Sequence, residues 1–196
     1  MRVFREICGT PVDPDGLWFD ASSVTGAAIR ETATYGGVRV KLLATLERAR
    51  IPLQVDVGFG DVNTPTAEIV RFPVPLGGPA PTLRGYPLAT VVAEKLESRT
   101  QLGLATSRMK DLYDVWHVLR TFDLNPDDVR AAIVRTFEHR GTASTAELTV
   151  LTEAFWKDPS KRVQWSAFLR RSDLTASDLE EVAREVAARL APMLLA

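Results

Sequence analysis

Apolar residues recur with two different spacings along the chain, and the change in spacing separates its two halves. Every second residue is apolar in residues 38–42, directly after Gly36-Gly37, which is typical of a half-buried strand that follows a turn. A second alternating run covers residues 53–59, in which Asp56 lies on the polar side. The first half of the chain therefore predicts β-strands.

Prolines and glycines gather between the two halves. Residues 72–87 hold five prolines and three glycines, a composition typical of an irregular connector rather than of a further regular element. We therefore expect an α+β fold with two domains, a sheet domain in residues 1–85 and a helical domain in residues 86–196.

Capping signals mark two helices near the end of the chain. Asn125-Pro126 is typical of an N-cap followed by a first helical residue, and it predicts a helix over residues 127–139. Thr175 with Asp178 resembles a capping box that opens the last helix. The apolar stripe of that last helix consists of Leu179, Val182, Val186 and Leu190.

Composition and charge restrict the class of protein. The chain has 196 residues, 45% of them hydrophobic, and a net charge of −1, as in ordinary globular proteins. Binding to nucleic acid would therefore need a local patch of Lys and Arg. The single cysteine, Cys8, excludes an internal disulfide, and no apolar run approaches the ~20 residues that cross a bilayer. We expect a cytoplasmic protein with no membrane partner.

Two cations fall on the apolar stripe of a helix predicted over residues 88–99. Lys95 projects from the middle of this stripe, and Arg99 lies one turn further along. Cations that face a core need an anionic partner. Either they extend to solvent or pair with a carboxylate for structural reasons, or they bind an anionic ligand. Spacing alone favours the structural interpretation.

The next predicted helix begins at residue 106 or 107 and supplies carboxylates. Asp111 shares a face with apolar residues one and two turns later, so we expect it to be partly enclosed and to be a candidate partner of Lys95. Lys110 and Asp114 lie one turn apart and predict a surface ion pair worth about 0.3 kcal/mol.

Three blocks of sequence, taken together, resemble the AbiEii/AbiGii nucleotidyltransferase toxins. They are residues 52–61, residues 86–96, which include Ala93-Glu94-Lys95-Leu96, and residues 107–114, which include Lys110-Asp111-Leu112-Tyr113-Asp114. Their order and spacing are similar to those of the family over most of the chain. Because the family resembles DNA-polymerase-β-type nucleotidyltransferases, the resemblance implies an incomplete nucleotidyltransferase-like mixed sheet followed by a helical bundle.

The resemblance also implies metal-assisted phosphoryl transfer from a nucleoside triphosphate, with Mg²⁺ as cofactor. Asp56 matches the third carboxylate of the family, a metal ligand and proton acceptor. Lys95 matches the lysine that contacts nucleotide phosphate. Asp111 matches a later aspartate that orients the site or pairs with the lysine, so these three are the candidate catalytic residues.

Four further residues are candidates for nucleotide binding by the same resemblance. Lys110 and Asp114 complete the motif around Asp111, and Arg99 and Arg108 are looser matches.

One part of the family pattern is missing. The family has a Gly-Ser turn followed by an Asp-x-Asp pair upstream of the three blocks, and residues 1–35 hold no such motif. Asp13-Pro14-Asp15 has two aspartates, but the proline between them and Gly16 after them indicate a turn. A lone Asp56 cannot hold two metal ions. We therefore expect a truncated or decayed relative with little or no transferase activity.

The leading hypothesis is a toxin-family enzyme that transfers a nucleotide to an RNA acceptor such as tRNA, with a cognate antitoxin as a further partner. The acceptor and the antitoxin are implied by the resemblance alone. One alternative is a non-catalytic module that binds nucleotide or RNA. Another is an interaction protein whose aromatic residues Phe155, Trp156, Trp165 and Phe168 form a surface, although aromatic residues at helical spacing more often form a core.

Overall fold

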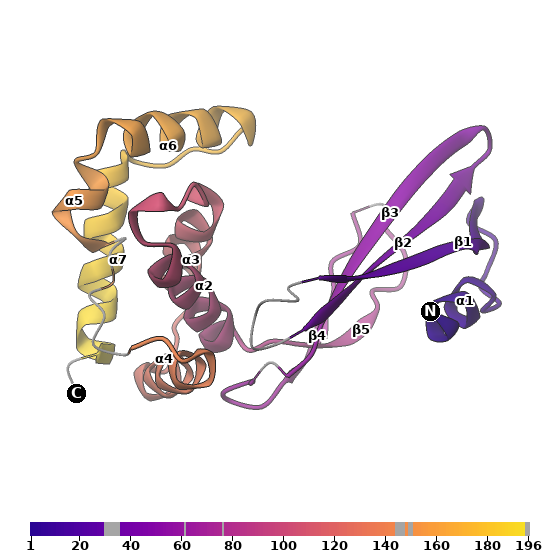
Figure 1. Cartoon of the computed structure of the whole chain (residues 1–196), viewed down its shortest axis with the longest axis horizontal. Coiled ribbons are helices and arrows are strands. Elements are labelled where there is room, and N and C mark those ends of the chain that lie inside the picture. Colours follow the sequence, from indigo (N-terminus) through magenta and orange to yellow (C-terminus); the bar gives the residue numbers. More distant parts are fainter. Residues whose placement is uncertain (30–35, 61, 76, 144–147, 149–150, 195–196) are drawn as a thin grey trace. The chain divides into compact units, whose positions relative to one another are not determined.

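A computed structural model describes residues 1–29, 36–60, 62–75, 77–143, 148 and 151–194. The chain divides into two compact units, Met1–Asp61 and Val62–Ala196, and each is treated by itself. Figure 1 labels their helices and strands. Small antiparallel sheets are followed by helices, so the predicted α+β class is confirmed. The predicted domain boundary after residue 85 lies inside the second unit.

The first unit is a three-stranded antiparallel sheet with one short helix. Its elements are α1 (Arg2–Cys8), β1 (Leu17–Ile29), β2 (Gly37–Leu46) and β3 (Ala49–Gly58), and the strand order is β1-β2-β3. The strands predicted at residues 38–42 and 53–59 are confirmed as β2 and β3, although β3 ends at Gly58. The register of the two strands matches the alternating pattern, because apolar Val40 lies opposite apolar Val55 and charged Arg39 lies opposite charged Asp56.

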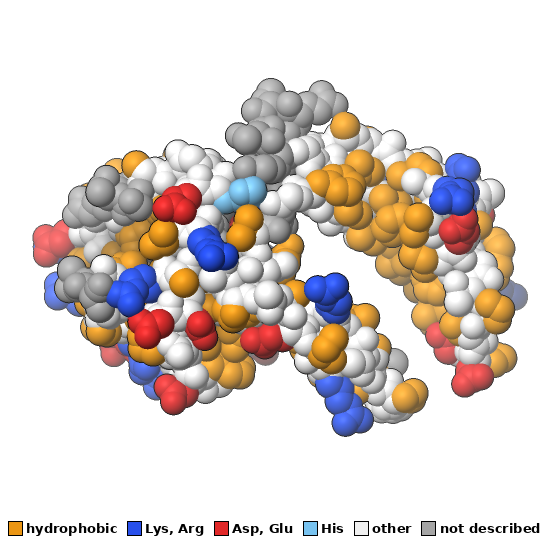
Figure 2. Space-filling model, turned by 90° about the horizontal axis from the view of Figure 1, so that it is seen from below, with side chains coloured by type: hydrophobic (Ala, Val, Ile, Leu, Met, Phe, Trp, Pro, Cys, Tyr) orange, Lys and Arg blue, Asp and Glu red, His pale blue; other side chains and the backbone are white. Residues whose placement is uncertain are grey.

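The sheet buries few side chains. Val40 and Ala44 are buried, whereas Trp18 on β1 is 61% exposed and Ile7 on α1 is 58% exposed. Figure 2 shows hydrophobic side chains gathered over this unit. An exposed apolar surface of this kind is unusual, because apolar area is normally removed from water by packing.

The second unit opens with a short hairpin that the sequence did not predict. Strands β4 (Glu68–Arg71) and β5 (Thr82–Gly85) pair antiparallel. The expectation that residues 72–87 form an irregular connector is therefore wrong for residues 82–85, which form β5. The prolines lie outside both strands, and residues 82–85 have none. Their backbone N–H groups are therefore available to the ladder.

Helices make up the rest of the second unit. They are α2 (Leu88–Leu102), the short 3₁₀ helix η1 (Gly103–Ala105), α3 (Met109–Thr121), α4 (Pro126–Arg140), α5 (Glu153–Trp156), α6 (Pro159–Arg171) and α7 (Leu179–Leu194). Helix α2 packs on α3 and α4, and α7 packs on the same two helices. The apolar stripe predicted for the last helix is buried in full. Phe155, Trp156, Trp165 and Phe168 are core residues, not a surface.

Side-chain caps are present at the N-termini of α4 and α7. Asn125 accepts a hydrogen bond from the backbone N–H of Asp127 at 2.8 Å, which confirms the predicted cap of α4. The capping box predicted at Thr175 is wrong, because Asp178 itself accepts from the N–H of Glu181 at 2.9 Å and α7 begins at the next residue. Asp is as good an N-cap as Thr, and both satisfy the open N–H groups of the first turn.

Within the residues that the structure describes, no helix combines the length and the apolar character needed to cross a membrane.

Candidate functional site

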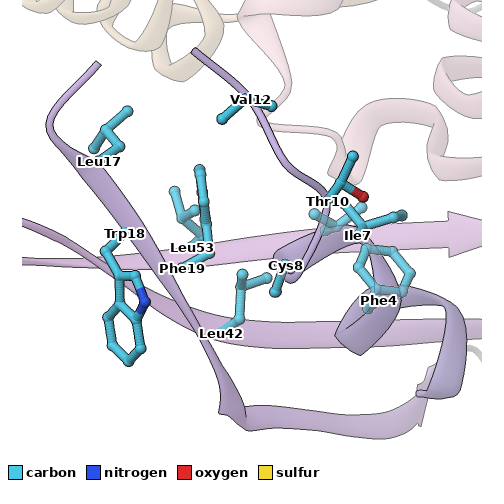
Figure 3. A pocket seen from close by; sticks show the side chains of 11 residues that line it. Phe4, Ile7, Cys8, Thr10, Val12, Leu17, Trp18, Phe19, Leu42 and Leu53 are labelled. Atoms are coloured by element: carbon cyan, nitrogen blue, oxygen red, sulfur yellow. The ribbon is translucent and has the colours of Figure 1, made fainter. Parts of the chain in front are cut away.

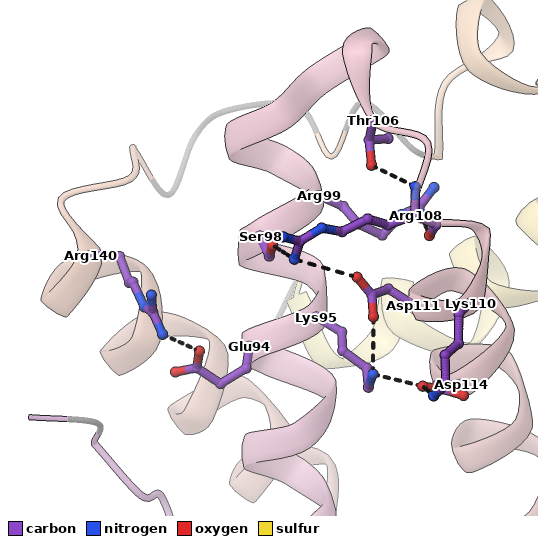
Figure 4. A network of polar contacts seen from close by, with 10 residues as sticks. All are labelled: Glu94, Lys95, Ser98, Arg99, Thr106, Arg108, Lys110, Asp111, Asp114 and Arg140. Atoms are coloured by element: carbon purple, nitrogen blue, oxygen red, sulfur yellow. Dashed lines mark hydrogen bonds and ion pairs between the residues drawn. The ribbon is translucent and has the colours of Figure 1, made fainter. Parts of the chain in front are cut away.

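Helix α2 carries charged side chains toward both of the helices that it packs on (Figure 4). On the α4 side, Glu94 accepts a hydrogen bond from Arg140 at 2.5 Å, and the buried Glu97 accepts one from Thr142 at 2.6 Å. On the α3 side, α2 presents Lys95. The cation that the sequence places on the apolar stripe of α2 therefore faces a neighbouring helix.

Lys95 joins the two aspartates of α3. Its Nζ donates to Asp111 Oδ1 at 3.1 Å and to Asp114 Oδ2 at 2.7 Å. The side chains of Lys95, Asp111 and Asp114 are 22%, 18% and 23% exposed. The predicted partnership of Lys95 with Asp111 is confirmed, as is the partial enclosure of Asp111. Asp114 is a second partner that spacing alone did not reveal.

Asp114 is shared between two lysines. Lys110 Nζ lies 2.6 Å from the same Oδ2 atom, which confirms the predicted pair one turn apart on α3. Burial opposes the charge of Asp114, but the hydrogen bonds from Lys110 and Lys95 outweigh it and lower the pKa of this carboxyl. Burial likewise opposes the charge of Lys95, and the hydrogen bonds to Asp114 and Asp111 outweigh it and raise the pKa of its ammonium. Both groups therefore stay ionised around neutral pH.

Arg99 is fully buried and has no carboxylate partner within the described part of the chain. Its Nη1 donates to the backbone carbonyl of Arg108, its guanidinium lies 5.1 Å from the ring centroid of Phe155, and its Nε and Nη2 have no hydrogen-bond partner. Burial lowers the pKa of Arg99 to about 10, and the charge of Asp111 opposes this shift. The group is still a cation at neutral pH, so it adds positive potential beneath the loop before α3.

A second buried cation holds the same loop. Lys161 on α6 is 5% exposed and donates to the carbonyl of Thr106 at 2.8 Å. Sequence reasoning missed this residue, although Lys161 shares a helical face with Trp165 and Phe168, which is the signal that singled out Lys95 on α2. Arg99 and Lys161 therefore fix the backbone from Thr106 to Arg108, from which the side chain of Arg108 extends.

Arg108 lies over the start of this network. Its Nη1 donates to Ser98 at 3.0 Å and lies 3.9 Å from Asp111 Oδ2, while its side chain is 59% exposed (Figure 4). The structure thus brings six predicted site residues into one network in the second unit: Lys95, Arg99, Arg108, Lys110, Asp111 and Asp114.

Asp56, the seventh predicted site residue, belongs to the first unit. It lies on β3, where both carboxylate oxygens accept from Arg39 on β2, at 2.8 Å from Nε and 2.7 Å from Nη2. This bidentate pair uses one lone pair on each carboxylate oxygen and balances the charge of Asp56. No group of three or more His, Cys, Asp or Glu side chains within the described ranges could hold a metal ion.

The first unit also contains an apolar cavity of about 580 Å³ between α1 and the sheet (Figure 3). Phe4, Ile7, Trp18, Leu42 and Leu53 are among its lining side chains. Apart from Cys8 and Thr10 this lining is apolar, and it has no charged side chain, so the polar network of the second unit is the better candidate site.

The fold and this network define a small α+β protein whose helical unit surrounds two aspartates with lysine and arginine side chains. The chain matches the model of the family described as "Nucleotidyl transferase AbiEii toxin, Type IV TA system" over residues 2–189, and it belongs to this family. The resemblance that the three sequence blocks indicate is therefore confirmed. Comparison with curated proteins and with solved structures finds no match.

Proposed function

We propose that the helical unit binds the phosphates of a nucleoside triphosphate at the Lys95 network. The protein would then be a toxin-family nucleotidyltransferase whose acceptor is an RNA such as tRNA. Family membership supports the reaction class, and the acceptor is an expectation from the same family. A cognate antitoxin as partner and a cytoplasmic location belong to the same proposal.

One observation carries this proposal, namely the surplus of cations around two aspartates. Lys95 and Lys110 already balance Asp111 and Asp114, which leaves Arg108 and the buried Arg99 without an equal negative charge nearby. An ammonium group has three donors, and Lys95 uses two of them on carboxylates. The third donor, together with the exposed ends of Arg108 and Lys110, suits phosphate oxygens.

We also propose that nucleotide transfer by this chain is weak or absent. The support is the engagement of Asp56 by Arg39 and the lack of a carboxylate cluster among the described residues. Mg²⁺ as cofactor is an expectation from the family alone.

The test measures binding of ATP, GTP, CTP and UTP by calorimetry, with and without Mg²⁺, to the unaltered chain and to Lys95→Met. We expect at least one nucleotide to bind, and we expect the substitution to weaken binding roughly tenfold or more, because a charge-assisted hydrogen bond is lost. The control is Lys157→Met, which also removes a lysine that pairs with a carboxylate, in this case Glu153 at 2.8 Å. This control should bind as the unaltered chain does, and circular dichroism checks that all three are folded.

Failure of the folded, unaltered chain to bind any of the four nucleotides would refute the proposed site. Transfer is followed separately with radiolabelled nucleotides and total RNA. Efficient labelling that disappears in Asp56→Ala would show that the chain is a full enzyme, and it would overturn the expectation of weak activity while leaving the nucleotide site in place.

A second candidate function is a non-catalytic module that binds nucleotide or RNA. The ion pair of Asp56 with Arg39 favours it, because this pair occupies the carboxylate that the family uses for metal. Binding of nucleotide without any label transfer, at every Mg²⁺ concentration, is the result that this function predicts.

A further inference from the structure

A polar cavity of about 660 Å³ opens beside the Lys95 network, between the start of α3 and helix α6. One wall consists of residues 107–111 and the other of residues on α6 and directly after it. The lining residues on the second wall are Gln164, Ala167, Phe168, Arg171 and Ser172. Both walls belong to the helical unit.

Positive charge dominates this cavity. Three lining side chains are cationic, Arg108, Lys110 and Arg171, and one is anionic, Asp111. Asp111 already accepts from Lys95 at 3.1 Å, so its charge is compensated before any ligand arrives. The cavity therefore has a positive charge that the protein itself does not neutralise.

Arg171 is the residue that makes this cavity different from the network already described. It comes from the last turn of α6, more than fifty positions after the sequence motif on α3, and the described residues offer it no hydrogen bond or ion pair. Its guanidinium therefore keeps all five donors available. In contrast, Arg108 contacts both Ser98 and Asp111, and Lys110 contacts Asp114.

The backbone around the cavity adds to its preference for anions. Helix α3 begins at Met109, on the wall of the cavity, and no side chain caps its N-terminus. The positive end of the helix dipole therefore lies at the same wall as Arg108 and Lys110. The buried Arg99 donates a hydrogen bond to the backbone carbonyl of Arg108, which lines this wall. Because Arg99 is fully buried, packing in the helical core fixes its position.

We propose that Arg171 completes, with Arg108 and Lys110, a binding site for a phosphate group in this cavity. The site rests on the proposed function, because its ligand is either a phosphate of the nucleoside triphosphate or a phosphodiester of the RNA acceptor. Guanidinium and ammonium groups recognise the same oxyanion in both ligands, and a fork of N–H donors can take two of its oxygens at once. Arg171 is thus a phosphate-binding residue contributed by α6 and not by the family motif on α3.

The experiment compares Arg171→Ala with Arg170→Ala. The control removes the same charge from the same turn of α6, but Arg170 does not line the cavity and also has no partner within the described ranges. Binding of ATP, GTP, CTP and UTP is measured by calorimetry, and binding of a labelled oligouridine and of total tRNA by fluorescence anisotropy at several salt concentrations. Thermal unfolding should be the same in both variants, because both side chains are exposed.

We expect Arg171→Ala to weaken binding of at least one phosphate ligand roughly fivefold or more, because it removes a charge-assisted contact. Weakening with nucleotides alone assigns the site to the triphosphate, and weakening with RNA alone assigns it to the acceptor. In the RNA case the dependence of log K on log salt should become shallower by about 0.7 for the single strand. Arg171→Lys should restore part of the affinity, because it keeps the charge but loses the fork.

Two results would overturn the inference, and they are distinguishable. Equal affinities for Arg171→Ala and Arg170→Ala, with strong binding by the unaltered chain, remove Arg171 from the site and leave the proposed function intact. A folded, unaltered chain that binds neither nucleotide nor RNA overturns both.

Discussion

At the scale of single residues, Arg99 is the most unusual side chain in the helical unit. A buried cation normally has a carboxylate close by, because burial without one costs several kcal/mol. Arg99 instead has a carbonyl partner, an aromatic ring and two nitrogen atoms without a hydrogen-bond partner among the described residues. Destabilising features such as a buried charge without an ion-pair partner are expected at functional sites, where the residues that activity needs often lower the stability of the fold. We interpret Arg99 as a source of positive potential for the phosphate site.

Replacement of Arg99 by methionine tests this interpretation. Arg99→Met should raise the free energy of unfolding at neutral pH by about 1 kcal/mol, because an apolar side chain of similar length replaces a buried charge that has no carboxylate within ion-pair distance in the part of the chain that the structure describes. The carbonyl of Arg108 keeps a donor, since the N–H of Asp111 lies 3.2 Å from it. The same variant should bind nucleotide more weakly. Urea unfolding and calorimetry measure the two effects.

A lower unfolding free energy in Arg99→Met would show that the cation stabilises the fold, and it would contradict this account. Phe155→Ala is the control for lost packing, because it removes the ring under the guanidinium and should destabilise by about 3–5 kcal/mol.

At the scale of elements, the contact of α2 with α3 depends on charge. The ion pair of Lys95 with Asp114 joins the two helices, and the pKa values of both groups are shifted. The pKa of Asp114 is below its ordinary value, so its contribution to stability is complete above about pH 4 and is lost as the pH falls through the lowered pKa. The pKa of Lys95 is above its ordinary value of 10.5, so its contribution is lost only as the pH rises beyond that value.

Acid unfolding should therefore report on Asp114. In the unaltered chain the free energy of unfolding should fall steeply below about pH 4, and in Asp114→Asn this fall should be smaller, because one native carboxylate no longer has to be protonated. The measurement is urea unfolding at a series of pH values. The control is Asp13→Asn, an exposed carboxylate without a partner in the described part of the chain. Identical pH profiles for Asp114→Asn and the unaltered chain would count against a stabilising network.

Sequence patterns predicted the elements that depend on local chemistry. Asn125 was found because a side-chain cap acts within three residues. The pairing of Lys95 with Asp111 followed from one charge on an apolar face in each of two consecutive helices. Strand β5 was missed because its few residues stand among prolines, and the composition of the segment hid the pairing with β4. Lys161 had the same local signal as Lys95, a charge on an apolar helical face, but its partner Thr106 lies 55 positions earlier. Arg171 was missed because no local pattern places α6 beside the start of α3, where this side chain lines the cavity.

At the scale of the whole molecule, charge and apolar surface are distributed unevenly. The net charge is only −1, yet cations gather around one cavity of the helical unit. Global charge therefore gave no indication of the phosphate site, and local geometry did. The sheet unit differs from this cationic cavity, because several large apolar side chains, among them Ile7, Trp18 and Val55, are exposed there.

The apolar cavity under α1 should therefore bind a hydrophobic dye in the native protein. We expect anilinonaphthalene sulfonate to fluoresce with the folded chain, and we expect Trp18→Ser to lower that fluorescence severalfold, because Trp18 lines the cavity and is 61% exposed. Phe72→Ser is the control, since Phe72 is 53% exposed but lies in the other unit. An equal loss of fluorescence in both variants would place the dye elsewhere. A loss confined to Trp18→Ser would show that the sheet unit, and not loosened packing of the helices, is the source of the exposed apolar surface.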